Sequence, residues 1–471
     1  MDEQEKLERL REIRLIVTEI LMFLAVVALV GFLTLIVTGH SFNLKKFGSE
    51  GEMFERTGLV QISSVPTGAT IAIDGEIPLM LRTNGSRTML TGEHTVKLSK
   101  DGYDTWEKTI TVTEGLMYRI NYPRLFLKER EREEVFEFEN LEYVTVSPNK
   151  EKMLVVEGGK TYLIDLNSVK PTQKLVFDGV ATNVKWSGNS ERVLAKIEGE
   201  WTVLLVKNAA ERLAIGELVK KVDAEFEITD LKFESEAGER LLVLLSDGTL
   251  REVDVRQKIL SEPIAKKVKR FDNDGDRIVY VTQTTVDGET QNQIRVMRVG
   301  MEESTLIALA AEAEAKVLTM RYFQDTYFGV VDDEKLNVYY AAAWPETELG
   351  VEKIFEETLE SKIEKFEKRG KGMVFAMEGV IEEERYAEVF DIEAMQLTRF
   401  VLAGATGWVD EYLRYAVSEN GELAVMDYDG LNYRVLVKDG ADVRRAVTIS
   451  GNGKYLYYFM ANGKLVREKV N

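Results

Sequence analysis

The sequence predicts a mainly β protein with three parts: one transmembrane helix, a small β-sandwich and an eight-bladed β-propeller. Three observations carry this prediction: a long apolar run near the N-terminus, a segment of short alternating strands after it, and a strand-rich unit that recurs to the last residue. A chain of 471 residues is long enough for two or three domains. We expect a cytoplasmic helix at 1–14, a transmembrane helix at 15–39, a linker at 40–57, a sandwich at 58–123 and a propeller at 124–471.

Residues 20–37 read ILMFLAVVALVGFLTLIV and contain no charge. At 1.5 Å per residue they span about 27 Å, close to the hydrocarbon thickness of a bilayer. The run is longer than a usual signal-peptide core, and no small-residue cleavage site follows it, so an uncleaved signal anchor is favoured.

The charges beside the apolar run predict its orientation. Lysines and arginines are more numerous before it than after it: Lys6, Arg9, Arg11 and Arg14 against Lys45 and Lys46. The positive-inside rule therefore places the N-terminus in the cytoplasm and the rest of the chain outside it. Glu19 lies at the cytoplasmic rim, where its carboxylate either reaches the headgroups or contacts a partner helix.

From residue 58 the pattern changes to short strands. "LVQISSVP" and "ATIAIDGE" alternate apolar and polar residues, and the second ends in the tight-turn pair Asp74-Gly75. Two more strands are expected at Thr95–Leu98 and Trp106–Val112. Several short strands within about 65 residues, without a helical period, predict a small β-sandwich.

The order of turns in this segment resembles that of the PEGA domain of bacterial and archaeal envelope proteins. The resemblance rests on Pro66-Thr67-Gly68-Ala69, on the hairpin Thr91-Gly92-Glu93-His94 and on Gly102-Tyr103. The segment departs from the family at Ile77-Pro78-Leu79, where a Gly-x-Thr-Pro step is common. The resemblance implies a surface-displayed protein and an association with carbohydrate or the cell wall.

Beyond a charged run, KEREREE at 128–134, the chain repeats a strand, a polar turn, an apolar strand, a turn and a third strand. Examples are "YVTVSPNKEKMLVVEGGKTYLIDL" and "AVTISGNGKYLYYFMANGKLVREKV". Short strands such as 134–138 and 173–177 fit between copies, which gives four strands per unit and a period of roughly 42 residues. We count eight units, with seven as the alternative. The Ser147-Pro148-Asn149-Lys150 turn resembles those of TolB-like and WD40-like propellers; a pair of β-sandwiches is the rival fold.

Composition excludes several classes of function. The formal charge of −19 argues against a nucleic-acid partner, because binding polyphosphate requires an excess of cations. The chain has no cysteine, and its two histidines, His40 and His94, both precede the propeller. Serine–histidine catalysis and histidine or thiolate metal sites are therefore not expected in the blades, and we expect no cofactor. A glycosidase needs only two carboxylates, so the composition does not exclude a glycosidase.

Two features could mark a binding site. Asp272, Asp274 and Asp276 alternate around Gly275 as at the start of a calcium loop, but Val281 stands where the loop requires a bidentate glutamate. A repeat turn is therefore the favoured interpretation of this stretch. Four tryptophans are candidate aromatic contacts: Trp186, Trp201, Trp344 and Trp408. Trp344, next to a proline in a loop, is the best candidate for ligand contact, whereas Trp186 fits a core position.

These patterns predict a single-pass, membrane-anchored envelope protein that displays a propeller to bind a protein or a cell-wall glycan and has no enzymatic activity. The alternative function is a carboxylate-based glycan hydrolase or lyase that acts in the propeller channel.

Overall fold

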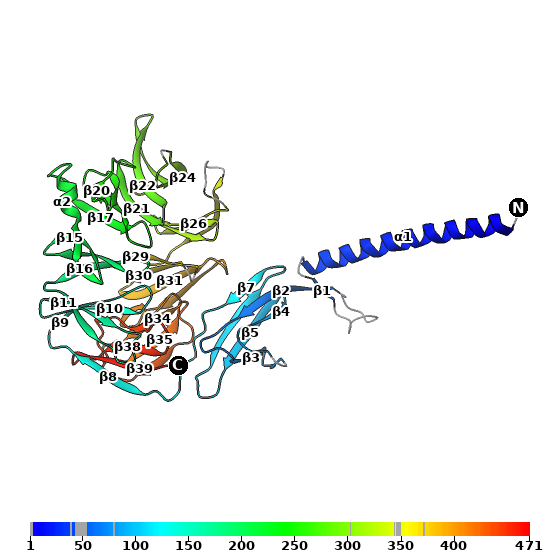
Figure 1. Ribbon diagram of the computed structural model, residues 1–471, viewed down its shortest axis with the longest axis horizontal. Coiled ribbons are helices and arrows are strands. Elements are labelled where there is room, and N and C mark those ends of the chain that lie inside the picture. Colours follow the sequence, from blue (N-terminus) through cyan, green and yellow to red (C-terminus); the bar gives the residue numbers. More distant parts are fainter. Residues whose placement is uncertain are drawn as a thin grey trace. The chain divides into compact units, whose positions relative to one another are not determined.

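The computed structural model describes residues 3–37, 40–42, 54–78, 81–301, 303–342, 344, 350–370 and 373–471 (Figure 1). The chain divides into two compact units, Met1–Lys128 and Glu129–Asn471. Residues 124–128, expected in the propeller, therefore lie in the first unit.

The first helix, α1, runs without a break over Glu3–Val37. Its segment Arg14–Leu35 has a mean hydropathy of 2.6 and is fully exposed, so the helix is long and apolar enough to cross a membrane. Thr18 and Thr34, the hydroxyl-bearing residues of that segment, each donate a hydrogen bond to the carbonyl oxygen four residues earlier. Glu19 is exposed on this helix.

The rest of the first unit is a two-layered β-sandwich. One sheet contains β1 (His40–Phe42), β2 (Phe54–Ile62), β4 (Gly85–Leu90) and β7 (Met117–Ile120), and the other contains β3 (Thr70–Ile73), β5 (Gly92–Ser99) and β6 (Trp106–Val112). Both ends of the segment expected to be a linker, 40–57, are therefore strand: His40 pairs with Arg56. Leu79 of the divergent Ile77-Pro78-Leu79 step lies outside the described residues.

Alternation of apolar residues produces the sandwich core. Ile71, Val96 and Trp106 point inward from the second sheet and are almost completely buried. Gly68 and Gly75 have φ values of +77° and +83°, a region that favours glycine, which explains their places in the two turns. The turn chemistry read from the sequence thus positions the strands that close this core.

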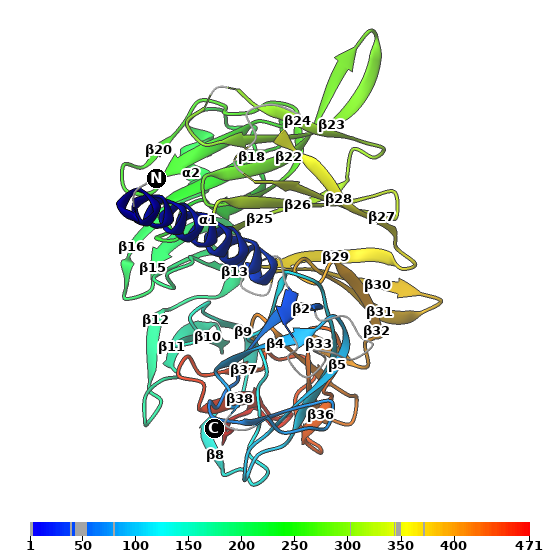
Figure 2. The ribbon, with the colours of Figure 1, turned by 90° about the vertical axis from the view of Figure 1, so that its right-hand side faces the viewer.

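The second unit forms eight four-stranded antiparallel sheets arranged in a ring (Figures 1 and 2). We number them as blades 1 to 8. Blade 1 contains β9 (Leu141–Val146), β10 (Lys152–Glu157), β11 (Lys160–Asp165) and β12 (Gln173–Phe177), and blade 2 contains β13 (Ala181–Trp186), β14 (Arg192–Ile197), β15 (Glu200–Leu205) and β16 (Asn208–Ala214). Blade 3 contains β17 (Ile228–Phe233), β18 (Arg240–Leu245), β19 (Leu250–Asp254) and β20 (Ile259–Leu260). Blade 4 contains β21 (Val268–Asp274), β22 (Arg277–Val286), β23 (Glu289–Arg298) and β24 (Thr305–Ala310). Blade 5 contains β25 (Lys316–Tyr322), β26 (Asp325–Asp332), β27 (Lys335–Ala341) and β28 (Glu352–Thr358). Blade 6 contains β29 (Lys362–Arg369), β30 (Val374–Ile381), β31 (Glu384–Asp391) and β32 (Gln396–Val401). Blade 7 contains β33 (Ala405–Trp408), β34 (Leu413–Val417), β35 (Leu423–Asp427) and β36 (Arg434–Val437). The short helix α2 (Ile215–Lys220) follows blade 2.

Blade 8 combines the two ends of the unit. It contains β37 (Thr448–Ile449), β38 (Tyr455–Phe459), β39 (Lys464–Lys469) and, as its outer strand, β8 (Arg132–Glu137). The charged run at 128–134 thus leads directly into the strand that closes the ring. Arg467 pairs with Glu133, and Arg130 binds Glu468 at 2.8 Å.

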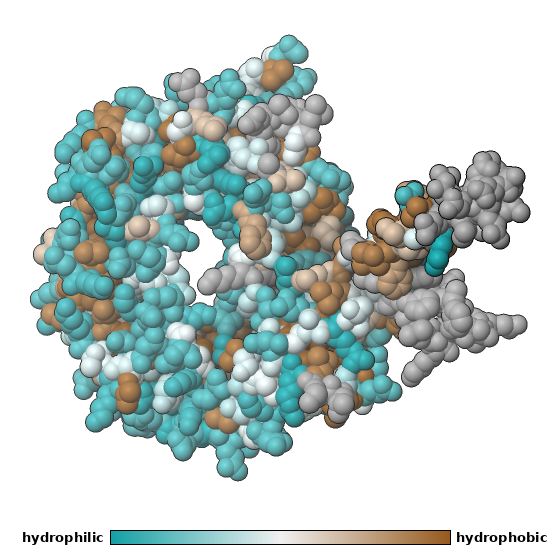
Figure 3. Space-filling model, turned by 45° about the vertical axis from the view of Figure 1, so that its right-hand side comes forward, coloured by the Kyte–Doolittle hydropathy of each residue, from teal (hydrophilic) through white to brown (hydrophobic). Residues whose placement is uncertain are grey.

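The core of the ring lies between neighbouring blades rather than in one central mass. Leu154 and Val156 of blade 1 pack against Val193 and Ala195 of blade 2, and similar clusters join the following blades. Figure 3 shows an opening through the centre of the ring. The hairpin of β22 and β23 is long enough to project beyond blade 4 (Figure 2).

A repeated turn occurs in four consecutive blades of the ring, after the first strand of blades 1, 2 and 8 and after the second strand of blade 7. In blade 1 the hydroxyl of Ser147 donates to Asn149 Oδ1 at 2.8 Å and accepts the backbone N–H of Lys152 at 3.0 Å. The same pair of bonds recurs in blades 2, 7 and 8 at Ser187–Asn189, Ser418–Asn420 and Ser450–Asn452. This local bonding explains the Ser-x-Asn pattern of the sequence.

Candidate functional site

The first strands of the blades carry a concentrated set of charges. The first strands of blades 4 and 5 contact each other, as do those of blades 5 and 6. The eight first strands hold 16 charged residues, 14 of them in blades 3 to 6. In those four blades nine are lysine or arginine and five are aspartate or glutamate, although the whole chain is acidic.

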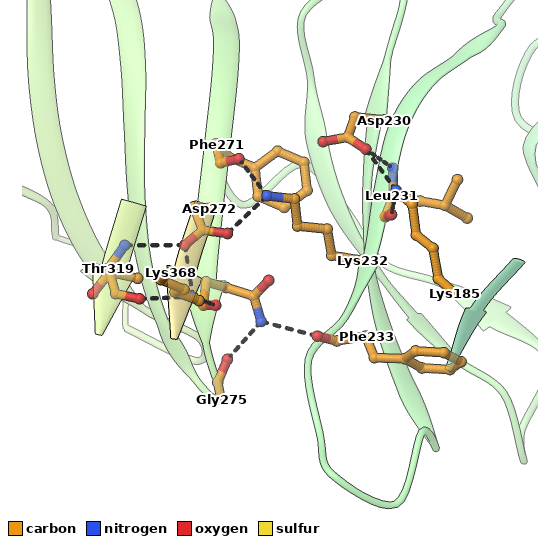
Figure 4. Close-up of polar contacts among 11 residues, drawn as sticks. Lys185, Asp230, Leu231, Lys232, Phe233, Phe271, Asp272, Gly275, Thr319 and Lys368 are labelled. Carbon is orange, nitrogen blue, oxygen red and sulfur yellow. Dashed lines mark hydrogen bonds and ion pairs between the residues drawn. The ribbon is translucent and has the colours of Figure 1, made fainter. Parts of the chain in front are cut away.

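Asp272, on β21, is the centre of this set (Figure 4). Its Oδ1 binds the ammonium of Lys232 from blade 3 at 2.7 Å, and its Oδ2 binds the ammonium of Lys368 from blade 6 at 2.7 Å. Oδ2 also accepts the backbone N–H of Thr319, in blade 5, at 3.0 Å. One buried carboxylate therefore joins four consecutive blades.

The surroundings of Asp272 keep it ionised. Burial by itself would raise the pKa of this carboxyl, but Lys368 and Lys232 outweigh burial and hold the pKa at about 2. Lys368 also donates to the carbonyl oxygens of Asn273 and Thr319, each at 2.6 Å. One carboxylate thus faces two ammonium groups, and backbone carbonyl oxygens accept the other hydrogen bonds of Lys368.

Related contacts extend the cluster toward blade 2. Lys185 binds Asp230 Oδ1 at 3.1 Å and the carbonyl oxygen of Leu231 at 2.7 Å (Figure 4). The side-chain amide of Asn273 donates to the carbonyl oxygens of Phe233 and Gly275. The first strands of blades 2 to 6 are thus linked by polar side chains in addition to apolar packing.

A second cluster joins blades 6 and 7 around Trp408. The indole N–H donates to Glu367 Oε1 at 2.6 Å, and the guanidinium carbons of Arg369 and Arg414 lie 4.4 and 4.7 Å from the ring centroid. Arg414 is completely buried and pairs with Glu378. Burial tends to raise the pKa of Glu367, but Arg369 and Lys365 lower it below its ordinary value. The indole is therefore engaged by protein groups.

The other three tryptophans also contact the propeller itself. Trp186 donates to Thr145 Oγ1 at 3.3 Å, and Trp201 lies beneath the ammonium groups of Lys185 and Lys196. Trp344 is half-buried, edge-on to Phe328 with ring centroids 6.3 Å apart, and the Arg277 guanidinium lies over its ring. Its role in ligand contact stays a prediction.

The three aspartates of the possible calcium loop bind three different protein groups. Asp272 holds the lysines described above, Asp274 accepts the backbone N–H of Arg321 at 2.7 Å, and Asp276 pairs with Arg298 at 2.6 Å. Within the described ranges, no group of three histidines or carboxylates is placed to hold a metal ion. Asp272 and Asp274 lie on β21, and Gly275 and Asp276 form the turn to β22, which agrees with the repeat-turn interpretation.

Sequence reasoning did not identify Lys232 and Lys368 as partners of Asp272. They lie 40 and 96 residues away, beyond any local pattern. One signal in the sequence could have indicated these partners: lysines and arginines accumulate on the first strands of an acidic chain. The clearest case is β29, which reads KIEKFEKR.

Residues 57–124 match the model of the PEGA domain family. This segment is a PEGA domain. The expected boundaries, 58–123, differ from the match by one residue at each end. A sequence comparison with curated proteins finds no match.

Solved structures similar to the chain include a WD40 domain and two peptidases. The C-terminal WD40 domain of Sif2 has a TM-score of 0.46 and 10% identity and covers 72% of this chain and 98% of its own. Dipeptidyl peptidase 4 of Porphyromonas gingivalis has a TM-score of 0.44 and 10% identity, covering 69% and 56%. The tricorn protease has a TM-score of 0.40 and 10% identity, covering 73% and 38%. The propeller that follows the PEGA domain is assigned here from its sheet topology.

Among the described groups, Glu234 is the one carboxyl whose pKa is raised. Burial raises the pKa of Glu234, and nearby Glu252 and Asp276 add to this effect, against an opposing contribution from Arg240. Its Oε2 is buried without a hydrogen-bond donor in the described structure. Glu234 lies at the turn after β17, outside the charged clusters of the first strands. Those clusters can brace the ring because their charges join neighbouring blades.

Proposed function

We propose that the protein is a single-pass envelope protein whose propeller binds a protein or a cell-wall glycan outside the cytoplasm. Support comes from the apolar helix Arg14–Leu35, the PEGA domain at 57–124 and the cations that precede the helix. In this proposal α1 is an uncleaved anchor with a cytoplasmic N-terminus, and the PEGA domain and propeller are displayed together.

The observation that carries the binding role is the internal pairing of the inner-strand charges. Asp272 is buried and Glu367 half-buried, the pKa of each carboxyl is lowered, and each is bonded to lysine, arginine or tryptophan. A glycosidase needs one carboxyl that holds a proton and a second with free access to the sugar. The inner strands instead brace a rigid ring, and rigid blades with variable outer surfaces suit recognition.

Orientation is tested by adding protease to intact cells that produce the full chain. The proposal expects the propeller to be cleaved or shaved together with known surface proteins. Protection of the propeller while those controls are trimmed would place it in the cytoplasm and contradict the proposed topology.

The binding role is tested with the full chain in detergent, mixed with purified cell-wall fractions and, separately, with solubilised membrane proteins. We expect retention on the wall or capture of a specific membrane protein, without release of sugar. Reducing ends that accumulate with time would instead establish the hydrolase alternative.

A further inference from the structure

Blades 2 and 3 enclose a surface groove with a volume of about 580 Å³. Its walls come from the outer strands β15 and β16 of blade 2 and from the turn after β19 in blade 3. The outer strand of blade 3, β20, is two residues long, which makes that blade narrow beside its neighbour. The groove lies apart from the charged clusters of the first strands.

The floor of the groove is aliphatic. It consists of Val203, Leu205, Leu213 and Val255, and no aromatic side chain is among the lining residues. Sugar sites commonly use aromatic faces against the ring, so this floor is poorly suited to a glycan. It is suited to valine, leucine or isoleucine side chains of a ligand.

The rim of the groove is basic. Arg192, Arg212, Arg256 and Lys258 line it, against one lining acid, Glu211. Glu239 neutralises part of this charge, because it pairs with Arg256 and lies 3.9 Å from Arg192. Within the described structure, Arg212 and Lys258 are exposed and have no ion pair.

The backbone of β16 adds a third feature. β16 is the outer strand of its sheet and pairs only with β15 among the described strands. Its pairing shifts between Leu204↔Arg212 and Leu205↔Asn208, so residues 209–211 have no residue opposite them on β15. An exposed strand edge can accept an extended peptide by backbone hydrogen bonds.

We propose that this groove docks an extended acidic peptide that alternates aliphatic and carboxylate side chains. The aliphatic side chains occupy the floor, and the carboxylates face Arg212 and Lys258. The excess of cations in an acidic chain provides charge complementarity for such a ligand. The inference rests on the proposed binding function and gives the chemistry of one ligand.

The test uses the full chain in detergent and a fluorescein-labelled ten-residue peptide that alternates leucine and aspartate. Fluorescence anisotropy should show binding that weakens with added salt. Two further peptides, one with lysine for aspartate and one with serine for leucine, should bind at least tenfold more weakly. Equal binding of either control peptide would overturn the proposal.

The site is tested by the double variant Arg212→Glu/Lys258→Glu, matched to Lys170→Glu/Lys174→Glu on exposed positions of blade 1. We expect at least tenfold weaker peptide binding for the first variant and unchanged binding for the second. On peptide addition, amide hydrogen exchange should slow in residues 208–213 of the wild-type chain. Equal affinities of the two variants, or protection elsewhere in the ring, would contradict the assignment.

A sulfated polysaccharide serves as the competing anion. Dextran sulfate could bind the wild-type chain and lose affinity in the Arg212→Glu/Lys258→Glu variant while the peptide does not bind. In that case the groove is an anionic-glycan site and the peptide proposal fails. If the peptide does not bind but the chain still retains a wall or membrane partner, the groove inference fails and the proposed function stands. If neither the peptide nor a wall or membrane partner binds the chain, both the groove inference and the proposed function are rejected.

Discussion

The two halves of the propeller are held together differently. Blades 7, 8, 1 and 2 share the Ser-x-Asn turn, and their first strands carry two charged residues, Glu142 and Lys185. Blades 3 to 6 carry fourteen such charges, and Asp272 links all four blades. Local turns thus distinguish one half of the repeated fold, and ion pairs between first strands distinguish the other, although blade 8 of the turn half also contains the ion pairs Arg467–Glu133 and Arg130–Glu468.

This difference has a physical cause. The bonds within a Ser-x-Asn turn span at most five residues, and neighbouring turns are also bonded to each other, as the backbone N–H of Asn149 donates to Ser190 Oγ at 3.2 Å. A buried carboxylate must find cations elsewhere, and here they come from neighbouring blades. A neutral hydrogen bond contributes less than a buried ion pair, so a single substitution should destabilise the turn half less than the ionic half.

The largest expected effect is that of Asp272→Asn. The change leaves Lys232 and Lys368 near each other without a counter-charge, and breaking a buried ion pair costs about 3–5 kcal/mol. Denaturant unfolding of the full chain should show a large drop in the midpoint. Asp439→Asn, at an exposed position, is the control and should change little. Equal, small effects for both variants would contradict the bracing role.

The same carboxylate predicts a pH dependence. Because its pKa in the fold, about 2, lies below the value of an unfolded aspartate, it stabilises the fold fully above about pH 4. This stabilisation is lost as the pH falls from about 4 toward 2. The difference in unfolding midpoint between wild type and Asp272→Asn should therefore shrink over that range. A difference that stays constant from pH 7 to pH 2 would show that the carboxylate charge is not responsible.

A smaller effect is expected in the turn half from Ser187→Ala. Ser187 is completely buried, and its hydroxyl binds Asn189 and the N–H of Arg192. Removal of these bonds should cost about 1 kcal/mol in the free energy of unfolding. Ser168→Ala, at a half-buried position with no side-chain hydrogen bond in the described structure, should be near neutral. A loss as large as that of Asp272→Asn would erase the distinction between the halves.

The smallest effect concerns Glu234, a buried acid of blade 3 without an ion pair in the described structure. Burial raises the pKa of Glu234, so its ionised form costs stability at neutral pH. Glu234→Gln should stabilise the chain by up to about 1 kcal/mol at pH 7 and have no effect below about pH 4, where the carboxyl is protonated in both states. Glu236→Gln, at an exposed position, is the matched control. Destabilisation at pH 7 would indicate that Glu234 has a partner in solution.

The parts that could be predicted from the sequence are those with local causes. The apolar helix, the turns at Gly68 and Gly75 and the Ser-x-Asn turns led to the sandwich and to eight sheets of four strands. The short strand expected at 134–138 corresponds to β8, Arg132–Glu137, but its pairing in blade 8 was not predicted, because its partners Arg467 and Lys464 lie more than 300 positions away. The links of Asp272 were hidden for the same reason.

Closure of the ring by β8 and β39 has a consequence during synthesis. Glu134 meets Lys464 across 330 residues of chain. At translation rates of roughly 5–20 residues per second, β8 waits on the order of 20–60 s before its partner is made. Throughout that interval β8 has no partner strand and the ring is not closed. The strand that closes the ring therefore remains an unpaired edge until the last strand of the propeller is made.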